Sequence, residues 1–361
     1  MDREGQPTAS HAAATEAKER VNLRDLTRQQ LCAWLEDKDY ATPQQALGVF
    51  KSVWQHAPEH IEALRGVGRS TREGLAEDAC ISTLAIDQRL ESADGTIKFI
   101  WRLSDGHRIE SVLIPDGDRL TLCISSQVGC AMGCTFCLTG DMGLIRHLTI
   151  GEIASQPLQV SAGLPDGQRI TNLVFMGMGE PLHNLKALLP ALEICLDDIA
   201  LNFSHRRVTV STVGLVPKMA ELAAALPVNL AVSINATLQS ERQRIMPISR
   251  KYSLERLMAE CRAFPLPSGK RITFEYVMFD GINDTLEDAA RLEKLIEGIP
   301  SKVNLIPYNP NPQQALQPPP HETVLAFQEH FAQRGITCTV RTTRGLDVAA
   351  ACGQLGKVKA S

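Results

Sequence analysis

Three closely spaced cysteines are the strongest chemical signal in the sequence. Cys130, Cys134 and Cys137 form a C-x3-C-x2-C motif, and thiolates grouped in this way bind metals. A structural zinc site takes four ligands, and no fourth Cys or His lies at a suitable local spacing. A 4Fe-4S cluster held by three cysteines instead leaves one iron open to a substrate or cofactor. The motif therefore predicts a 4Fe-4S cluster.

A glycine-rich segment further along the chain could bind an amine. Residues 176–181 read Met-Gly-Met-Gly-Glu-Pro and follow an apolar, strand-like run. Gly179 has no Cβ, so a ligand could approach its backbone closely, and the carboxylate of Glu180 could hold an ammonium group. A Gly-x-Gly after a strand is often only a turn. The segment becomes a candidate binding site because it accompanies the cysteine motif.

Four further polar residues lie at or near the ends of other predicted strands. They are Ser211, Ser233, Asn235 and Asn309. Parallel barrels bind their ligands at the carboxyl ends of the strands, so all four are candidates for cofactor contacts. Taken singly, each is more often a loop residue whose hydrogen bonds are satisfied within the protein.

A scaffold for these residues can be read from the hydrophobic pattern. Apolar runs predict strands at residues 120–125, 170–176, 207–212, 228–234, 272–279 and 303–308. Amphipathic stretches between them predict helices, among them residues 185–196, 254–264 and 286–296. Strands that alternate with helices indicate an α/β fold with a parallel sheet, here an incomplete (β/α)6 barrel over residues 121–361.

Three other segments precede the barrel. Residues 1–20 are polar and lack apolar periodicity, so we expect a disordered tail. Residues 21–80 show helical spacing and predict a small helical domain. Residues 81–120 contain three Asp-Gly pairs about eleven residues apart between strand-like runs, which predicts a β-meander accessory segment.

The overall charge gives the chain no general attraction for nucleic acid. The net charge is −4 and aromatic residues make up 5%, which argues against a base-stacking platform. The basic residues gather between positions 201 and 275. Arg242, Arg244, Arg250 and Lys251 follow the fourth predicted barrel strand, where phosphate contact and a plain solvated face are equally good interpretations.

No segment predicts export or membrane insertion. The first residues lack a basic region followed by an apolar one, and no apolar run reaches 18 residues. Ten cysteines in 361 residues are too few for a disulfide scaffold. We therefore expect a cytoplasmic protein with no membrane partner.

Several motifs together resemble the RlmN group of ribosomal RNA adenine-C2 methyltransferases, within the radical S-adenosylmethionine (SAM) superfamily. Phe136 matches the aromatic position of the superfamily's cysteine motif, and residues 176–181 resemble its "GGEP" element, which grips the methionyl amino group of SAM. The narrower resemblance extends from about residue 23 to 355. Its segments are residues 108–112, 123–130, 177–182, 306–310 and 345–355. One departure is Asn235, where much of the family has histidine.

The resemblance implies a radical mechanism and roles for particular residues. One SAM would methylate Cys352, and a second, bound to the cluster, would be cleaved to a 5′-deoxyadenosyl radical. That radical would take hydrogen from the methylated Cys352, and the resulting thiomethylene would add to adenine C2. Glu110 would accept the C2 proton, and Cys123 would form a disulfide with Cys352 to release the product.

The same resemblance implies the partners. The substrate would be an adenosine in the peptidyl transferase loop of 23S rRNA, with the adenosine 3′ of the anticodon in some tRNAs as a further candidate. A reducing electron donor such as flavodoxin and a monomeric state are expected. The helical domain at residues 21–80 would recognise RNA shape, since it is not basic. Two alternatives remain open: a related C8-adenine methyltransferase, and a non-catalytic zinc or iron-sulfur RNA-binding protein.

Overall fold

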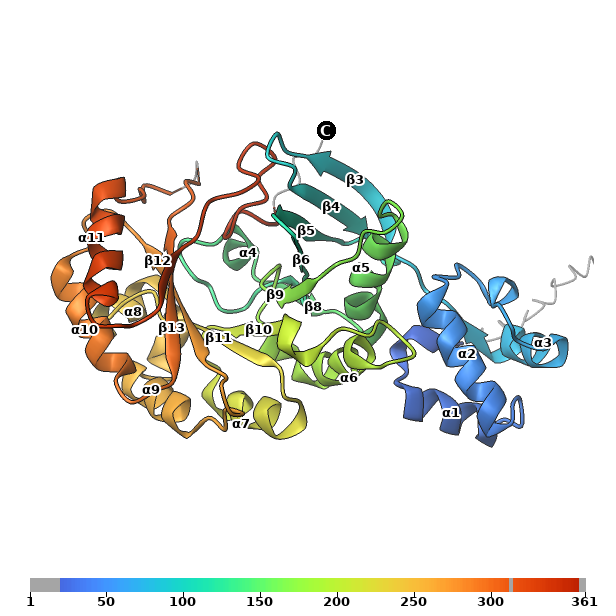
Figure 1. The fold of residues 1–361 in the computed structure, drawn as a ribbon. Helices are drawn as coiled ribbons and strands as arrows, with labels where there is room; N and C mark the ends of the chain where they lie inside the picture. The colour runs from blue at the N-terminus through green and yellow to red at the C-terminus, as the bar shows by residue number, and fades with distance from the viewer. Residues whose placement is uncertain (1–19, 312–313, 357–361) are drawn as a thin grey trace, which may run out of the picture.

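The computed structural model describes residues 20–311 and 314–356 (Figure 1). Apart from its last residue, the tail predicted at residues 1–20 lies outside these ranges. No helix in the described part of the chain is long and apolar enough to cross a membrane.

The N-terminal unit is helical, as the spacing of its apolar residues predicts. Its elements are β1 (Val21–Asn22), α1 (Arg28–Asp37), α2 (Pro43–Gln55), α3 (Arg69–Asp78) and β2 (Ala79–Cys80), with short 3-10 turns at Leu23–Asp25 and Ile61–Ala63. Thr27 and Thr42 begin α1 and α2 with capping boxes, in which the side chains of residues 30 and 45 bond back to the cap. The unit lies at one side of the molecule and contacts the barrel, where Arg28 bonds Asp197.

The meander follows as three antiparallel strands. They are β3 (Ala85–Glu91), β4 (Ile97–Arg102) and β5 (Arg108–Asp116). The three Asp-Gly pairs occupy the predicted turns, and their glycines, at positions 95, 106 and 117, have φ values of +83°, +85° and +56°. This left-handed conformation favours glycine and explains why the hairpins turn at these pairs.

The barrel strands run parallel and are continuous with the meander. Their bounds are β6 (Arg119–Cys123), β9 (Asn172–Phe175), β10 (Val208–Thr212), β11 (Asn229–Ser233), β12 (Ile272–Met278), β13 (Ser301–Pro307) and β14 (Cys338–Val340). The sheet order is β14-β13-β12-β11-β10-β9-β6-β5-β4-β3. The six predicted strands are present, and β14 is an additional short strand. The meander therefore extends the barrel sheet beyond β6 instead of forming a separate accessory layer.

Helices cover the outer face of the barrel strands (Figure 1). They are α5 (Ile150–Ala162), α6 (Leu185–Leu196), α7 (Val216–Ala225), α8 (Gln239–Ile245), α9 (Leu254–Ala263), α10 (Leu286–Ile296) and α11 (His321–Ala332). Fully buried side chains such as Leu188, Met219, Leu257 and Leu292 form the core between helices and sheet. The remaining short elements are β7 (Gln127–Gly129), α4 (Leu138–Asp141), β8 (Leu144–His147) and the 3-10 turns Pro181–Asn184, His205–Arg207 and Pro247–Arg250.

Candidate active site

A cavity of about 160 Å³ lies at the carboxyl ends of the barrel strands. Most residues predicted for the site line this cavity. They are Cys130, Cys134, Cys137, Gly179, Glu180, Ser211, Ser233, Asn235 and Cys352. Three others, Glu110, Cys123 and Asn309, are not part of its wall. The fold thus brings together residues from three regions. They are the loop with the three cysteines (residues 130–137, the cysteine loop), the ends of three strands, and the chain after β14 (residues 341–356, the C-terminal segment).

The cysteine loop is held by backbone hydrogen bonds to three different parts of the chain. The amide of Cys130 donates to the carbonyl of Gly143 at 2.8 Å, and the amide of Thr135 donates to the carbonyl of Ile245 at 3.0 Å. Leu138, directly after the third cysteine, donates to the carbonyl of Gly353 at 2.8 Å. The loop that carries the three thiols therefore contacts the segment that carries Cys352.

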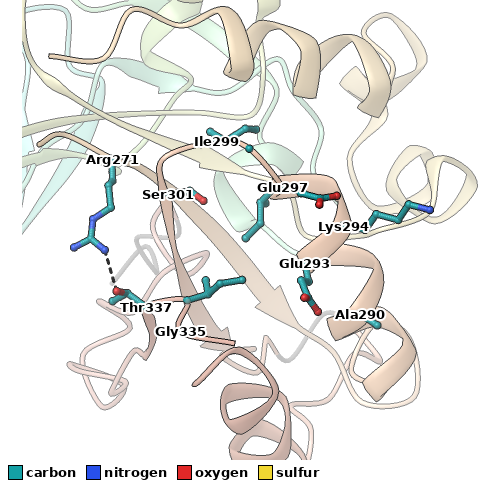
Figure 2. A pocket seen from close by; sticks show the side chains of 12 residues that line it. Arg271, Ala290, Glu293, Lys294, Glu297, Ile299, Ser301, Gly335 and Thr337 are labelled. Carbon is teal, nitrogen blue, oxygen red and sulfur yellow. Dashed lines mark hydrogen bonds between the residues drawn. The ribbon is translucent and has the colours of Figure 1, made fainter. Parts of the chain in front are cut away.

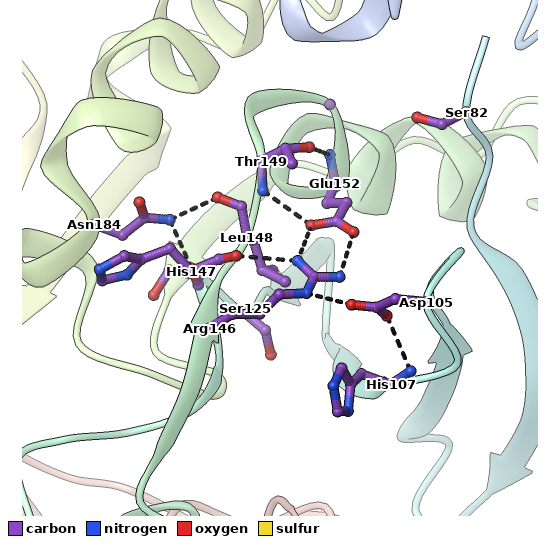
Figure 3. Close-up of polar contacts among 12 residues, drawn as sticks. Ser82, Asp105, His107, Ser125, Arg146, His147, Leu148, Thr149, Glu152 and Asn184 are labelled. Atoms are coloured by element: carbon purple, nitrogen blue, oxygen red, sulfur yellow. Dashed lines mark hydrogen bonds and ion pairs between the residues drawn. The ribbon is translucent and has the colours of Figure 1, made fainter. Parts of the chain in front are cut away.

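Arg146 fixes the β7–β8 hairpin (Figure 3). Its Nε donates to Asp105 in the turn between β4 and β5 at 2.6 Å, and its two terminal nitrogens donate to Glu152 at 2.7 and 2.8 Å. Glu152 also accepts from the amide of Thr149 as part of the capping box of α5. One guanidinium thus ties the hairpin to the meander and to the first barrel helix.

The three cysteines form a donor set suited to a cluster. Burial is the main cause that raises the pKa of each thiol, to about 12 for Cys130 and well above its ordinary value for Cys134. A positively charged metal group would be needed to hold them as thiolates. Within residues 20–311 and 314–356, no three His, Cys, Asp or Glu side chains converge on a point for a single metal ion. A cluster has its irons at separate corners, so its ligands need not converge on one point.

Glu180 lines the same cavity, and its carboxyl group is buried. Burial raises its pKa to about 7, although amides of Val213 and Leu182 donate to it at 3.0 and 3.3 Å. An ammonium group in the cavity would restore its ionised form, because an opposite charge favours ionisation. The side chain therefore suits a ligand that carries a positive charge.

The glycines beside Glu180 are required for packing within the protein. A Cβ on Gly177 would lie 2.6 Å from the carbonyl oxygen of Ile124, and one on Gly179 would lie 2.6 Å from the side chain of Gln127. Gly179 also has a φ of +98°. The close approach that the sequence attributed to a ligand is thus made, in this structure, by the segment that follows β6.

Asn235 lines the cavity but uses its side chain to join two strand ends. Its φ is +57°, a conformation that asparagine tolerates better than most residues. Its Oδ1 accepts from the amide of Val277 at 2.9 Å, and its Nδ2 lies 3.3 Å from the sulfur of Met246. A contact between Asn235 and a cofactor remains a prediction.

The phosphate contact considered for Arg242 is wrong. Its side chain is buried and donates to the carbonyls of Val213, Ser233 and Ile234, which close the ends of β10 and β11. Burial lowers its pKa to about 10. The other basic residues of this group, Arg244, Arg250 and Lys251, are exposed.

Asn309 holds the C-terminal segment. Its Nδ2 donates to the carbonyl of Cys352 at 3.1 Å, and its Oδ1 accepts from the hydroxyl of Thr343 at 3.0 Å. Cys123 is buried at the end of β6, where burial, and to a lesser degree the charge that Cys352 can carry, raises the pKa of its thiol. Both are free thiols in this structure. The disulfide between them remains a prediction.

Glu110 also contacts the C-terminal segment. Its Oε1 accepts from the amide of Gly356 at 3.2 Å, and its Oε2 lies 3.1 Å from the ammonium of Lys98. Lys98 in turn donates to the carbonyl of Ala349 at 3.1 Å. Both charged side chains are almost fully buried, with exposed fractions of 4% and 1%. Sequence reasoning missed Lys98, since a lysine in a meander strand carries no motif.

Other cavities in the described part of the chain are larger than the active-site cavity, and two of them have volumes near 500 Å³. One of about 490 Å³ lies beside the end of α10 and is lined by side chains that include Arg271, Glu293 and Lys294 (Figure 2). It contains none of the predicted site residues. The other, of about 500 Å³, is bordered by residues of the barrel strands that include Thr121, Thr209 and Thr273, and it shares Met176, Glu275 and Arg341 with the active-site cavity. Arg341 was also missed, because it follows the unpredicted strand β14.

Comparisons with known proteins show similarity along nearly the whole chain. Residues 124–292 match the radical SAM superfamily. Proteins described as dual-specificity RNA methyltransferase RlmN are 51% identical in Anaeromyxobacter sp. (92% of this chain, 85% of that protein) and 49% identical in Geotalea uraniireducens (93% and 97%). The crystal structure of a radical SAM methyltransferase from Sphaerobacter thermophilus has a TM-score of 0.87 and 39% identity, covering 93% of this chain and 99% of that one.

Proposed function

The chain belongs to the RlmN family of radical SAM RNA methyltransferases, and we propose that it methylates C2 of an adenosine in the peptidyl transferase loop of 23S rRNA. The adenosine 3′ of the anticodon in tRNAs is a proposed second substrate, in keeping with the dual specificity named for its relatives. The observation that carries the proposal is that Cys352 lines the same cavity as Glu180 and the three cysteines of the loop.

The cofactors follow from the superfamily, whose members use SAM and a 4Fe-4S cluster. We propose that Cys130, Cys134 and Cys137 hold the cluster, which when bound would supply the electron that cleaves SAM to a 5′-deoxyadenosyl radical. Glu180 would bind the amino group of SAM. Ser211, Ser233, Asn235 and Asn309 are proposed as further contacts, of which all but Asn309 line the cavity.

Three residues are proposed to carry the methyl group and the proton. Cys352 would accept the methyl group, present the methylene carbon to adenine C2, and remain bonded to the base until the adduct is resolved. Glu110 would accept the C2 proton. Cys123 would attack the sulfur of Cys352, forming a disulfide as the bond from that sulfur to the methylene carbon breaks, and the carbon would keep the electron pair and take up a proton to leave the methylated base.

The contacts of Glu110 imply that the C-terminal segment shifts during the reaction. One carboxylate oxygen accepts from the amide of Gly356, and the other lies beside Lys98. A base that takes a proton from adenine needs a free oxygen within hydrogen-bond reach. We therefore propose that Gly356 leaves Glu110 when RNA enters, which would couple movement of the segment bearing Cys352 to exposure of the base.

The proposed RNA contacts are local. Arg244, Arg250 and Lys251 are exposed and could bind phosphates, while the helical unit from Val21 to Cys80 would recognise RNA shape. We further propose that an electron donor such as flavodoxin reduces the enzyme. The enzyme is proposed to be a monomer.

Two cysteine variants test this function. Cys352→Ala should yield neither methylated protein nor methylated RNA, because the methyl acceptor is missing. Cys123→Ala should still form the adduct but fail to release it, so RNA should stay attached to Cys352 as a nuclease-sensitive shifted band on a denaturing gel. A Cys352→Ala protein that methylates RNA would refute the methyl-shuttle scheme.

Product analysis separates the remaining alternatives. Mass spectrometry of 23S rRNA, from a strain lacking the gene and from one carrying it, should show 2-methyladenosine that depends on the gene. Finding 8-methyladenosine would favour the C8 enzyme. Anaerobic metal analysis should find four irons per chain, whereas one zinc and no methylated product would indicate a non-catalytic binding protein.

A further inference from the structure

A buried glutamine joins the turn that carries Glu180 to two histidines. Gln127 lies on β7 and is fully excluded from solvent. Its Oε1 accepts from the backbone amide of Glu180 at 2.8 Å. Its Nε2 lies 2.9 Å from Nδ1 of His147 and 3.2 Å from Nδ1 of His183. One side chain therefore connects β7 to β8 and to the 3-10 turn that begins after Glu180.

Backbone contacts hold the two histidines in place. Gln127 and His147 are paired directly in the β7–β8 hairpin. Asn184, the residue after His183, donates to the carbonyl of Leu148, the residue after His147, at 2.9 Å (Figure 3). The two imidazole rings meet edge to face, with centroids 5.1 Å apart and planes at 78°. The pair is thus set by the strand and the turn that carry it.

The backbone also determines which protonation state this arrangement requires. The amide of Glu180 can only donate, so the atom of Gln127 that faces it must be the oxygen. The NH2 group of Gln127 then faces both histidines and can only donate. Each Nδ1 must accept, which it can do only while it carries no proton. A proton on Nδ1 of His147 or His183 would break one bond and set two N–H groups against each other.

The surroundings of the pair allow it to respond to solvent pH. Both histidine side chains are exposed on one side, so protons reach them directly from solvent. Burial of part of the ring, then His147 and Lys251, lower the pKa of His183. Three further charged groups lie on or next to β8 and bond one another. They are Arg146, Asp105 and Glu152.

We propose that Gln127 is a positioning residue for Glu180, and that His147 and His183 make the binding of SAM depend on pH through it. The inference rests on the proposed function, in which Glu180 binds the amino group of SAM. With both rings neutral, Gln127 is held by two bonds and fixes the backbone of Glu180. When a ring gains a proton, one of these bonds is lost and Glu180 is held less firmly. Affinity for SAM should therefore fall as the pH drops below about 6.5, the ordinary pKa of histidine.

The first test measures SAM affinity against pH. Full-length protein loaded with its cluster is kept anaerobic, and the dissociation constant of SAM is measured by equilibrium dialysis at about pH 5.5 and about pH 8. Protonation of Glu180 itself weakens binding at the lower pH in every protein that is compared. The double variant His147→Gln, His183→Gln keeps an acceptor at both places but takes up no proton there. Its loss of affinity between the two pH values should be about two- to tenfold smaller than that of the unchanged protein, the effect of one hydrogen bond.

Two further variants separate this role from a general effect on folding. Gln127→Met keeps a side chain of similar length but removes the amide, so it should weaken SAM binding at both pH values and show the reduced pH dependence of the double variant. The control His205→Gln removes an exposed histidine from the 3-10 turn before β10 and should keep the pH dependence of the unchanged protein. Melting temperatures at both pH values identify any variant that has lost its fold.

A second measurement uses neither SAM nor RNA. Deuterium exchange at the ring carbon between the two nitrogens, followed by mass spectrometry of peptides, gives the protonation midpoint of His183. In Gln127→Met this midpoint should rise by about half a pH unit or more, because a bond that favours the neutral ring is lost.

The inference is overturned if the folded double variant keeps the full pH dependence of SAM affinity, or if the midpoint of His183 is the same with and without the amide of Gln127. Protein that carries its cluster but binds no SAM at any pH would instead overturn the proposed function. The two failures can therefore be told apart.

Discussion

The buried ion pair between Lys98 and Glu110 allows a quantitative test of how the C-terminal segment is held. Its charged atoms are 3.1 Å apart, and both side chains are almost fully excluded from water. At an effective dielectric constant of about 20, two unit charges at this distance attract by roughly 5 kcal/mol. The net value is smaller because each charge has lost its hydration, and removing one partner of such a pair typically costs about 3–5 kcal/mol.

Lys98→Met is the informative perturbation. It keeps the apolar stem but removes the ammonium, which leaves Glu110 with only the amide of Gly356 and removes the bond to the carbonyl of Ala349. We expect the free energy of unfolding, from urea titration, to fall by about 3–5 kcal/mol. A matched control is Lys218→Met, which breaks an exposed pair with Glu221 and should cost less than about 1 kcal/mol.

The double variant Lys98→Met, Glu110→Gln completes the test. It removes both buried charges, so its loss should be smaller than the sum of the two single losses by about 1–3 kcal/mol. The reasoning that the pair is buried and coupled would be refuted by either of two results. One is a Lys98→Met protein whose free energy of unfolding falls by less than about 1 kcal/mol, and the other is a double variant whose loss of stability equals the sum of the two single losses.

Three further predictions concern buried polar residues in and behind the cavity wall. Arg242→Met should lower the free energy of unfolding in urea by at least about 2 kcal/mol, because buried carbonyls lose their donor. Asn235→Ala should lower the free energy of unfolding by about 1–3 kcal/mol, because the amide of Val277 loses its acceptor. The same variant should bind SAM more weakly in an equilibrium binding measurement. Burial raises the pKa of Glu275 in the folded protein. As the pH rises, the unfolded chain therefore loses the Glu275 proton at a lower pH than the folded protein does. Stability should therefore fall as pH rises above the ordinary carboxyl range, and Glu275→Gln should flatten that slope in urea titrations at several pH values.

The predicted barrel is confirmed, and its helices show why some elements could be read from the sequence. The helices predicted at residues 185–196 and 286–296 have the bounds of α6 and α10. Thr285 caps α10 with Asp288, and apolar residues follow at helical spacing, so local and tertiary preferences agree. Strand β14 could not be predicted, because three residues, of which Thr339 is exposed, are too few to show an alternating pattern.

Residues of the candidate site could be predicted where a single short motif contains them. The three cysteines and Glu180 lie in short segments, and the strand ends bring them together. The burial of a side chain and the identity of its bonding partners could not be predicted in this way, since they depend on distant parts of the chain. Arg242 belongs to a basic segment, yet it faces the interior, and nothing in a count of charges shows this. Likewise, the partners of Lys98 lie 12 and 251 residues away, in β5 and in the C-terminal segment.

The turns of the meander have a second use that their sequence does not show. Asp94 stands in an Asp-Gly turn, which a hairpin alone would explain, but its Oδ2 also accepts from the amide of Gly345 at 2.9 Å. At the far end of the same segment, the hydroxyl of Thr139 donates to the carbonyl of Leu355 at 2.7 Å. Cys352 lies between these two attachments. Because the attachments use side chains of the meander and of α4, which follows the cysteine loop, the position of Cys352, the proposed methyl acceptor, depends on both.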